Sequence, residues 1–309
     1  ACLVGSEMCI RDRVNMVTPT FFIESLVDGI VLGGIYAVIA LGLSMMYGVA
    51  GVLNIAHGDL VMLAGLLTFS LTTFFTQPIV GFVLAPAIML PLFFLLGLGI
   101  FNGLLKPISK RPPQYQLLSS ILLTLGISFI LQDLAATFLG TLPRSIYMGL
   151  PPLRIWEASI PFFRVITFGI VLFITIVCWI FLRQTFLGRA MRAVTYNRES
   201  SSFLGIPINR VAAMSFGLGT ILAAVGGVIY MGNGFPMTPF IGLSITVKAL
   251  TVIVVGGAGK LAGALVGGMV LGIAETLTGV FISFYWSPAL AIIILLAILM
   301  IKPTGIIGD

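Results

Sequence analysis

The sequence predicts an all-α integral membrane protein, built as a polytopic bundle of about eight or nine transmembrane helices. Hydrophobic residues make up 59% of the 309 residues and charged residues only 8%, whereas a soluble domain carries about 25% charged residues. In addition, no Asp, Glu, Lys or Arg occurs between Asp59 and Lys106. Lipid rather than water must therefore surround most of the chain, whose mean hydropathy is +1.17.

The candidate spans are nine apolar runs, because each approaches the length of about 20 residues that crosses a bilayer. The gap at 141–164 contains prolines and mixed charges. We expect it to be an outer loop that contacts the membrane surface through Trp156, Phe162 and Phe163. The nine runs lie at about 26–48, 60–76, 79–105, 116–140, 165–182, 211–231, 241–256, 261–282 and 286–301.

The domain organisation follows from the same pattern. Residues 1–15 contain Cys2, Cys9 and four charged residues, and they lack the apolar core of a secretory signal. We interpret 1–15 as a non-native or disordered head and Met16 as the natural start. Residues 16–309 are then one transmembrane domain.

The distribution of basic residues predicts the orientation, because cytoplasmic loops carry an excess of Lys and Arg. The predicted outer loops hold only Arg144, Arg154 and Arg164. Nine spans then place the N-terminus outside and the C-terminus in the cytoplasm. The ten basic residues of the opposite loops are Lys106, Lys110, Arg111, Arg183, Arg189, Arg192, Arg198, Arg210, Lys260 and Lys302.

The longest of these inner loops, 183–210, is predicted to contain a short exposed helix. Asn197 is a favourable N-cap for a helix over about 198–204. Gly205 suits the position after the helix, and Pro207 prevents its continuation. An ordinary basic inner loop is the alternative.

Asn54 and His57 lie in the segment NIAHGD at 54–59, which contains the single histidine of the chain. Irregular backbone at membrane depth must be buried in protein or line a cavity. Asn54 and His57 could satisfy the backbone groups freed there and so belong to a translocation path. A turn at the inner face, with Asp59 as a helix cap, is the simpler alternative and the one that the residues alone favour.

Three further candidates for a path or gate are the charged residues Asp133, Lys248 and Glu275, which lie within apolar runs. Ionisable groups in a span are costly and usually face the bundle interior or water. Lys248 could pair with Glu275, although the two are offset in predicted depth. The alternative places Asp133 and Glu275 at the outer membrane interface.

Three glycine pairs at a spacing of four predict close helix packing: Gly29 with Gly33, Gly263 with Gly267, and Gly268 with Gly272. Such small-residue pairs let helix backbones approach one another in lipid.

Several functions are excluded. The glycine-rich segment Lys248–Lys260 is not a phosphate-binding loop, because Val254 and Leu261 stand where the motif requires Gly and Ser or Thr. The chain should therefore bind neither ATP nor another cofactor by itself. A metal or catalytic centre is not expected with one histidine and scattered acids, so the chain is not predicted to be an enzyme. The net charge of +6 comes from residues between apolar runs, which does not indicate nucleic-acid binding.

Four segments together resemble the permease family of branched-chain amino acid ABC importers, and within it the H-type permease of the Liv system. They are 29–58 (GIVLGGIYAVIALGLSMMYGVAGVLNIAHG), 123–132 (LTLGISFILQ), 188–210 and 248–275. The most specific elements are NIAHGD, GRAMRA followed by LGI, and VVGGAGKLAGALVGG.

This resemblance implies a subunit of the bacterial inner membrane that forms a pathway with a second permease subunit. Two cytoplasmic ATP-binding subunits would drive transport, and a periplasmic solute-binding protein would deliver leucine, isoleucine or valine. It also implies that the short helix in 183–210 is a coupling helix for the ATPase. Phe203 and Leu204 would be its apolar anchors, with Arg198 and Glu199 at the polar rim, Ser200 where the family commonly has Ala, and Gly205 at the end.

Other functions stay open on the sequence alone. Within the family, the solute could be urea or a short amide. Outside it, a secondary transporter or channel would also have many spans and few buried charges, but it would not need a docking helix. A membrane enzyme would need clustered polar residues at one membrane face.

Overall fold

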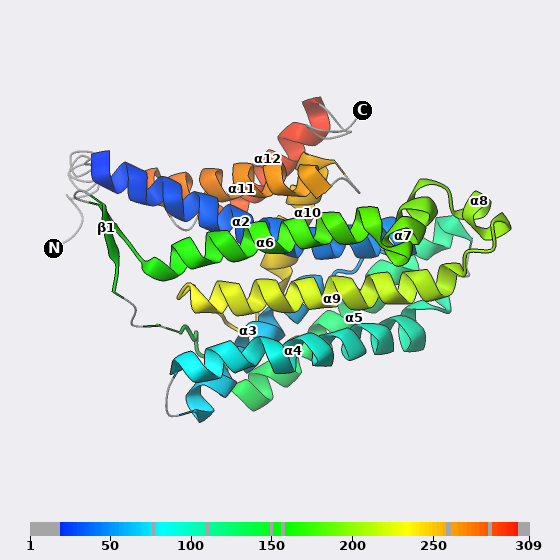
Figure 1. Cartoon of the computed structure of the whole chain (residues 1–309), viewed down its shortest axis with the longest axis horizontal. Coiled ribbons are helices and arrows are strands. Elements are labelled where there is room, and N and C mark those ends of the chain that lie inside the picture. Colours follow the sequence, from blue (N-terminus) through cyan, green and yellow to red (C-terminus); the bar gives the residue numbers. More distant parts are fainter. Residues whose placement is uncertain are drawn as a thin grey trace, which may run out of the picture.

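The computed structural model describes residues 19–75, 78–108, 112–146, 148, 151–155, 158–257, 261–283 and 286–301 (Figure 1). Several predictions fall outside these residues, namely those on the head 1–15 and on Lys110, Arg111, Trp156, Lys260 and Lys302.

The fold is a bundle of helices, as predicted, and each of the nine apolar runs forms a helix. Seven helices in the described part of the chain are long and apolar enough to cross a membrane. The other two, α10 (Gly242–Gly256) and α12 (Ser287–Ile301), have 15 residues each, about 22 Å of helix against a hydrocarbon core of about 30 Å. The seven are α2 (Pro19–Ala50), α3 (His57–Phe74), α4 (Pro78–Ile100) with its π-helical end η1 (Phe101–Leu105), α5 (Pro113–Leu139), α6 (Phe162–Gln184), α9 (Ile208–Gly232) and α11 (Leu261–Phe281).

Helix α2 is the central element, in contact with α6, α9, α10 and α11. The backbones of α2 and α11 are in direct contact, because glycines at the contact leave no room for a side chain. A Cβ atom added to Gly272 would lie 2.2 Å from Gly33 N, and one added to Gly33 would lie 2.6 Å from Gly268 O. A Cβ on Gly263 would lie 2.0 Å from Gly256 O of α10. The predicted close packing at the glycine pairs is therefore confirmed, and the pairs of α2 and α11 face each other.

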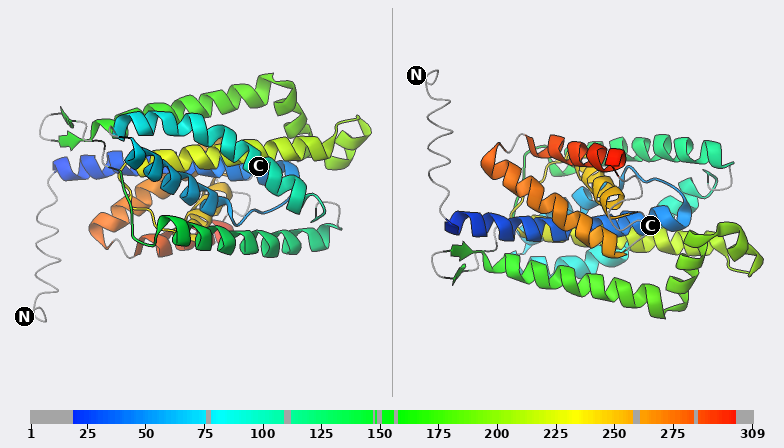
Figure 2. Two further views of the ribbon diagram at one scale, coloured as in Figure 1. Left: turned by 90° about the horizontal axis from the view of Figure 1, so that it is seen from below. Right: turned by 90° about the horizontal axis from the view of Figure 1, so that it is seen from above.

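Helices α5 and α6 run along opposite flanks of the bundle (Figure 2). Most of their apolar side chains are exposed, including Leu122 and Phe129 of α5 and Phe173 of α6. These surfaces suit contact with lipid, because lipid tails are as apolar as the side chains themselves. Helix α5 contacts the rest of the bundle mainly through α3 and α10.

One end of the bundle carries the predicted outer loop. The described residues between α5 and α6 contain a short antiparallel hairpin, β1 (Leu153–Ile155) with β2 (Ala158–Ile160). The expected loop therefore contains strand pairing that its composition did not indicate. Phe162 and Phe163 begin α6, and Arg164 forms an ion pair with Asp28 of α2.

The opposite end carries segment 183–210, which forms two helices rather than the single predicted one, α7 (Phe186–Tyr196) and α8 (Arg198–Phe203) (Figure 1). Helix α7 was not predicted, because its apolar residues lie on one face of the helix and do not form a continuous apolar run. It buries Ala190, Met191 and Val194. Its N-cap Thr185 accepts a hydrogen bond from Gly188 N at 3.0 Å.

The predicted ends of α8 are confirmed. Asn197 Oδ1 accepts from Ser200 N at 2.9 Å, as an N-cap does. Gly205 has φ +77°, and Ile206 N donates to Ser201 O at 3.1 Å. This is the Schellman ending that glycine favours.

Candidate functional site

The first candidate region is the non-helical segment between α2 and α3. Gly51 has φ +64° and ends α2, and Asn54 and His57 are 1% and 0% exposed. His57 Nε2 lies 2.9 Å from Ile39 O, and Gly58 N donates to Thr246 Oγ1 of α10 at 2.9 Å. Residues 51–56 are therefore non-helical backbone with a turn at 55–56, and the side chains of Asn54 and His57 are buried in protein.

Asp59 does not cap α3, contrary to the simpler interpretation. Helix α3 begins at His57, and Ala56 holds the N-cap position without a side-chain hydrogen bond. Asp59 is fully buried and accepts from Gln132 Nε2 of α5 at 2.9 Å. The start of α10 lies against it, because a Cβ on Gly242 would lie 1.9 Å from Asp59 Oδ1. The carboxylate thus links three helices.

The second region is a buried ion pair between α10 and α11. Lys248 Nζ donates to Glu275 Oε1 at 2.6 Å and to the Tyr36 hydroxyl of α2 at 2.9 Å. Lys248 and Glu275 are 9% and 7% exposed. The offset expected from counting residues disappears because α10 is short and lies oblique to α11 (Figures 1 and 2).

Asp133 lies apart from this pair, exposed on α5. The structure thus brings together two of the three predicted intramembrane charges. Sequence reasoning missed Gln132 and Asp59 as partners. A signal for them exists, since polar residues recur at every fourth position of α5 from Gln116 to Gln132.

Replacing Lys248 by Met should destabilise the folded chain, because it leaves the buried Glu275 without its cation. Breaking such a pair from one side costs about 3–5 kcal/mol. The double variant Lys248→Met with Glu275→Gln should regain much of this loss, since no charge is then buried alone. Thermal unfolding of the purified chains in detergent measures both effects. A single variant with the wild-type melting temperature would show that the pair contributes nothing to stability.

The third region is the exposed tip of segment 183–210. Phe203 and Leu204 are 91% and 79% exposed, although they are apolar and lie outside the spans. Glu199 and Ser200 are also exposed, whereas Ser201 is buried. An exposed apolar pair on a rigidly capped helix is typical of a surface that another protein covers.

Arg198, at the start of α8, forms a hydrogen bond with the bundle. Its Nη1 donates to Ala50 O at 3.2 Å, the last residue of α2, where a cation also suits the helix dipole. Its partial burial lowers the pKa of the guanidinium, but arginine keeps its charge in proteins. Arg198 therefore ties α8 to the central helix of the bundle.

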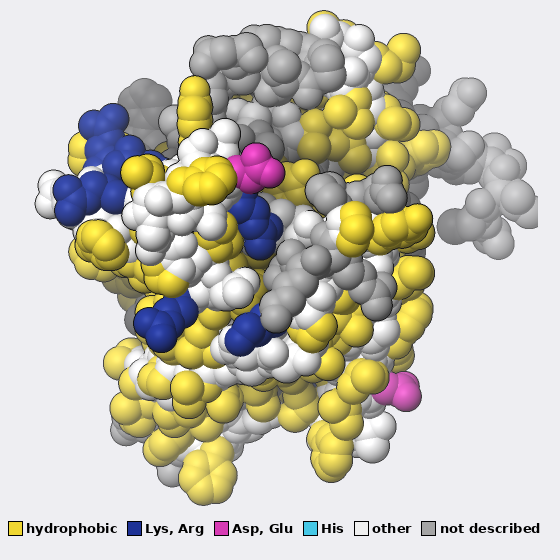
Figure 3. All heavy atoms as spheres, turned by 90° about the vertical axis from the view of Figure 1, so that its right-hand side faces the viewer, with side chains coloured by type: hydrophobic (Ala, Val, Ile, Leu, Met, Phe, Trp, Pro, Cys, Tyr) yellow, Lys and Arg dark blue, Asp and Glu magenta, His cyan; other side chains and the backbone are white. Residues whose placement is uncertain are grey.

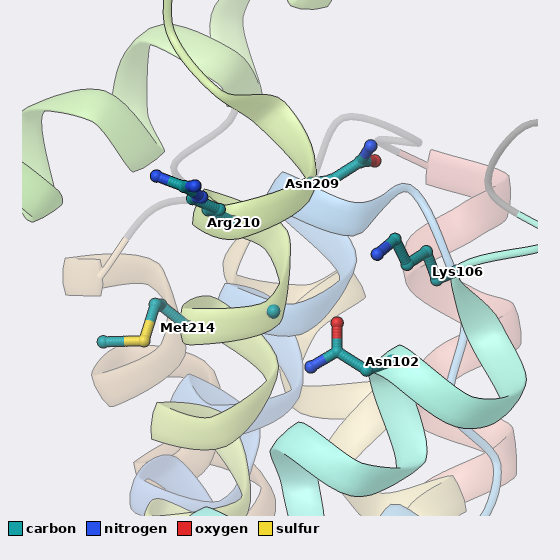
Figure 4. Close-up of a pocket in the computed structure, with 6 residues that line it drawn as sticks. Asn102, Lys106, Asn209, Arg210 and Met214 are labelled. Atoms are coloured by element: carbon teal, nitrogen blue, oxygen red, sulfur yellow. The ribbon is translucent and has the colours of Figure 1, made fainter.

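Two hollows with basic walls lie at the start of α9, and one of them reaches α8. One, of about 270 Å³, is lined by Asn102 and Lys106 of the α4–η1 end and by Asn209 and Arg210 of α9 (Figure 4). The other, of about 500 Å³, shares Lys106, Asn209 and Arg210 with the first and is also lined by Arg198 and Ser202 of α8. Figure 3 shows this end of the molecule, where Lys and Arg side chains lie among hydrophobic ones. Basic side chains therefore lie close to the exposed apolar tip of α8.

The apolar helical bundle, with its seven helices long enough to cross a bilayer in the described part of the chain, is that of a polytopic membrane protein. The family model described as "Branched-chain amino acid transport system / permease component" matches residues 25–301. The chain belongs to this permease family.

Three relatives are similar to the chain over most of their length. The chain is 31% identical over 304 residues to the high-affinity branched-chain amino acid transport system permease protein LivH of Escherichia coli (strain K12), covering 93% of this chain and 96% of that one. It is 28% identical to the corresponding protein BraD of Pseudomonas aeruginosa, with the same coverage. It is also 24% identical to the ribose import permease protein RbsC of Haemophilus influenzae, over 93% of this chain and 88% of that one.

Proposed function

We propose that this chain is the permease subunit of an ATP-driven importer for branched-chain amino acids. The observation that carries the proposal is the exposed tip of α8, whose capped ends and apolar residues Phe203 and Leu204 fit a docking role. A channel or secondary transporter would have no use for such a tip. The similarity to LivH and BraD supports the solute class.

Coupling to the ATPase would pass through Arg198, Glu199, Ser200, Phe203, Leu204 and Gly205. Phe203 and Leu204 would enter an apolar groove of a cytoplasmic ATP-binding subunit. Arg198 would transmit the movement to α2 through Ala50 O. ATP hydrolysis would belong wholly to the two partner subunits.

The translocation path would use the buried groups near α10. We propose that Lys248 and Glu275 act as a gate that joins α10 to α11 in one state and separates in another. Asn54 and His57 would provide hydrogen-bond partners for the backbone of the interrupted segment as it moves. Asp133, exposed on α5, would face a second permease subunit or the outer interface. The cycle is then a population shift between inward- and outward-open states.

The orientation of the chain in the membrane would follow from the end of the bundle that is rich in basic residues. Arg183, Arg189, Arg192 and Arg210 belong to elements at the end that carries α7 and α8 (Figure 1), so this end would be cytoplasmic. The N-terminus would then be outside, the C-terminus in the cytoplasm, and the membrane the bacterial inner membrane. A periplasmic solute-binding protein would dock at the hairpin end.

The decisive experiment is reconstitution in vesicles with the ATP-binding subunits, a second permease and the solute-binding protein. We expect ATP-dependent uptake of leucine and co-purification of the ATP-binding subunits. Labelled ribose and urea serve as competing solutes, since a ribose permease is among the relatives. Leucine uptake that is equally fast without ATP would favour a secondary transporter and contradict the proposal.

A further inference from the structure

Helix α5 carries a row of polar residues spaced four apart, and its exposed residues are mostly apolar apart from Asp133 and Thr137. Residues four apart lie on the same side of a helix, and the rest of α5 presents side chains such as Leu122 and Phe129, which are 60% and 62% exposed. Polar groups that faced lipid would be costly. The face consists of Gln116, Ser120, Thr124, Ser128 and Gln132.

This polar face lies along the interrupted segment between α2 and α3. Near the inner end, Gln116 Nε2 donates to Ala50 O at 3.3 Å. In the middle, Ile55 N donates to Thr124 Oγ1 at 3.1 Å. Farther along, Gln132 Nε2 donates to Asp59 Oδ1 at 2.9 Å. A continuous polar seam, defined as these five residues of α5 against residues 50–59, thus follows the helix for about 24 Å.

The seam can open without leaving its hydroxyl groups unsatisfied. Ser120 Oγ donates to Leu117 O at 2.8 Å and Thr124 Oγ1 to Ser120 O at 2.8 Å, both within α5. These serine and threonine side chains therefore keep a partner when the neighbouring segment moves away. Since α5 meets the bundle mainly through α3 and α10, few other contacts hold the seam shut.

Asp59 lies at the far end of the seam and forms no ion pair with a described residue. It is 0% exposed, and its Oδ2 atom has no hydrogen-bond partner among the described residues. Glu275 and Asp28, by contrast, are paired with Lys248 and Arg164. A buried carboxylate in a span is costly unless it meets a positive charge.

We propose that the polar seam is the route of the solute through this chain, and that the Asp59 carboxylate binds the ammonium group of a zwitterionic amino acid. The proposal rests on the proposed transport function and specifies its solute contacts. The passing solute would replace Gln132 and the segment 50–59 as hydrogen-bond partner of the seam. Ribose and urea carry no ammonium group, so Asp59 would select against them.

The variant Asp59→Asn tests the charge, because it keeps an oxygen that can accept from Gln132 and removes only the negative charge. In the reconstituted complex, leucine uptake should fall by roughly 10- to 100-fold, as expected for a lost charge-assisted hydrogen bond. ATP hydrolysis by the complex should be retained. Wild-type uptake from this variant would overturn the role of Asp59.

Cysteine labelling tests the seam while Asp59 stays native. The three cysteines of the chain, Cys2, Cys9 and Cys178, are replaced by serine. Thr124→Cys and Ser128→Cys are then compared with the controls Phe173→Cys and Ile176→Cys, which lie on the exposed apolar surface of α6. A membrane-impermeant thiol reagent should label the seam positions in the cycling complex, and leucine should slow that labelling. Seam positions that label no faster than the controls would overturn the route. If the wild-type complex does not import leucine, that result refutes the proposed transport function. The accessibility of the seam positions is measured separately by the labelling.

Discussion

Phe203→Asp should abolish ATP-coupled uptake while the chain still inserts and folds in the membrane. The side chain is 91% exposed, so the fold gains nothing from it. In the complex with the ATP-binding subunit, the Phe203→Asp variant would place a carboxylate in the apolar groove of that subunit. Losing such an anchor costs about 2–4 kcal/mol, which corresponds to roughly 30- to 900-fold in affinity for the ATPase.

The measurement is leucine uptake in vesicles, together with co-purification of the ATP-binding subunits. Phe186→Asp is the matched control, because Phe186 is also an exposed phenylalanine of segment 183–210 but lies at the start of α7, outside α8. We expect the control to keep uptake. Equal uptake by the Phe203 variant and the wild type would remove α8 from the coupling mechanism.

Gly272→Val should prevent α2 and α11 from packing and so unfold the chain. A Cβ on Gly272 would lie 2.3 Å from Gly33 Cα and 2.5 Å from Gly29 O. These atoms belong to backbone and cannot rotate away, so the helices would have to separate. Overpacking a core typically costs about 1–3 kcal/mol, and we expect at least the upper value here.

Gly126→Val is the control for this substitution, because it makes the same change in a helix of the same chain. No atom lies within 4 Å of a Cβ at Gly126. Thermal unfolding in detergent should show a large fall in melting temperature for Gly272→Val and little change for Gly126→Val. Similar melting temperatures for the two variants would mean that the α2–α11 contact is less close than described.

Local signals account for the parts that were predicted correctly. The apolar runs fix the helices because each run must satisfy its own backbone in lipid. Asn197 and Gly205 fix the ends of α8, because capping uses atoms only a few residues apart. The glycine spacing marked the faces that pack, although it did not show that Gly33 meets Gly268 and Gly272.

The side-chain contacts that were missed depend on partners distant in the chain. Gln132 is 73 residues from Asp59 and Lys248 is 212 from Tyr36. The polar spacing of α5 indicates a buried face, but nothing in the sequence indicates which distant residue each side chain meets. Helix α7 escaped because its apolar residues form one face instead of a run.

The sequence by itself determined that this protein lies in the membrane, that its apolar runs are helical, and that a capped helix stands outside the spans. Only the tertiary structure decided which polar groups meet inside the bundle. The physical reason is that hydropathy and capping act over a few neighbouring residues, whereas a buried carboxylate or ammonium group finds its partner through the packing of whole helices.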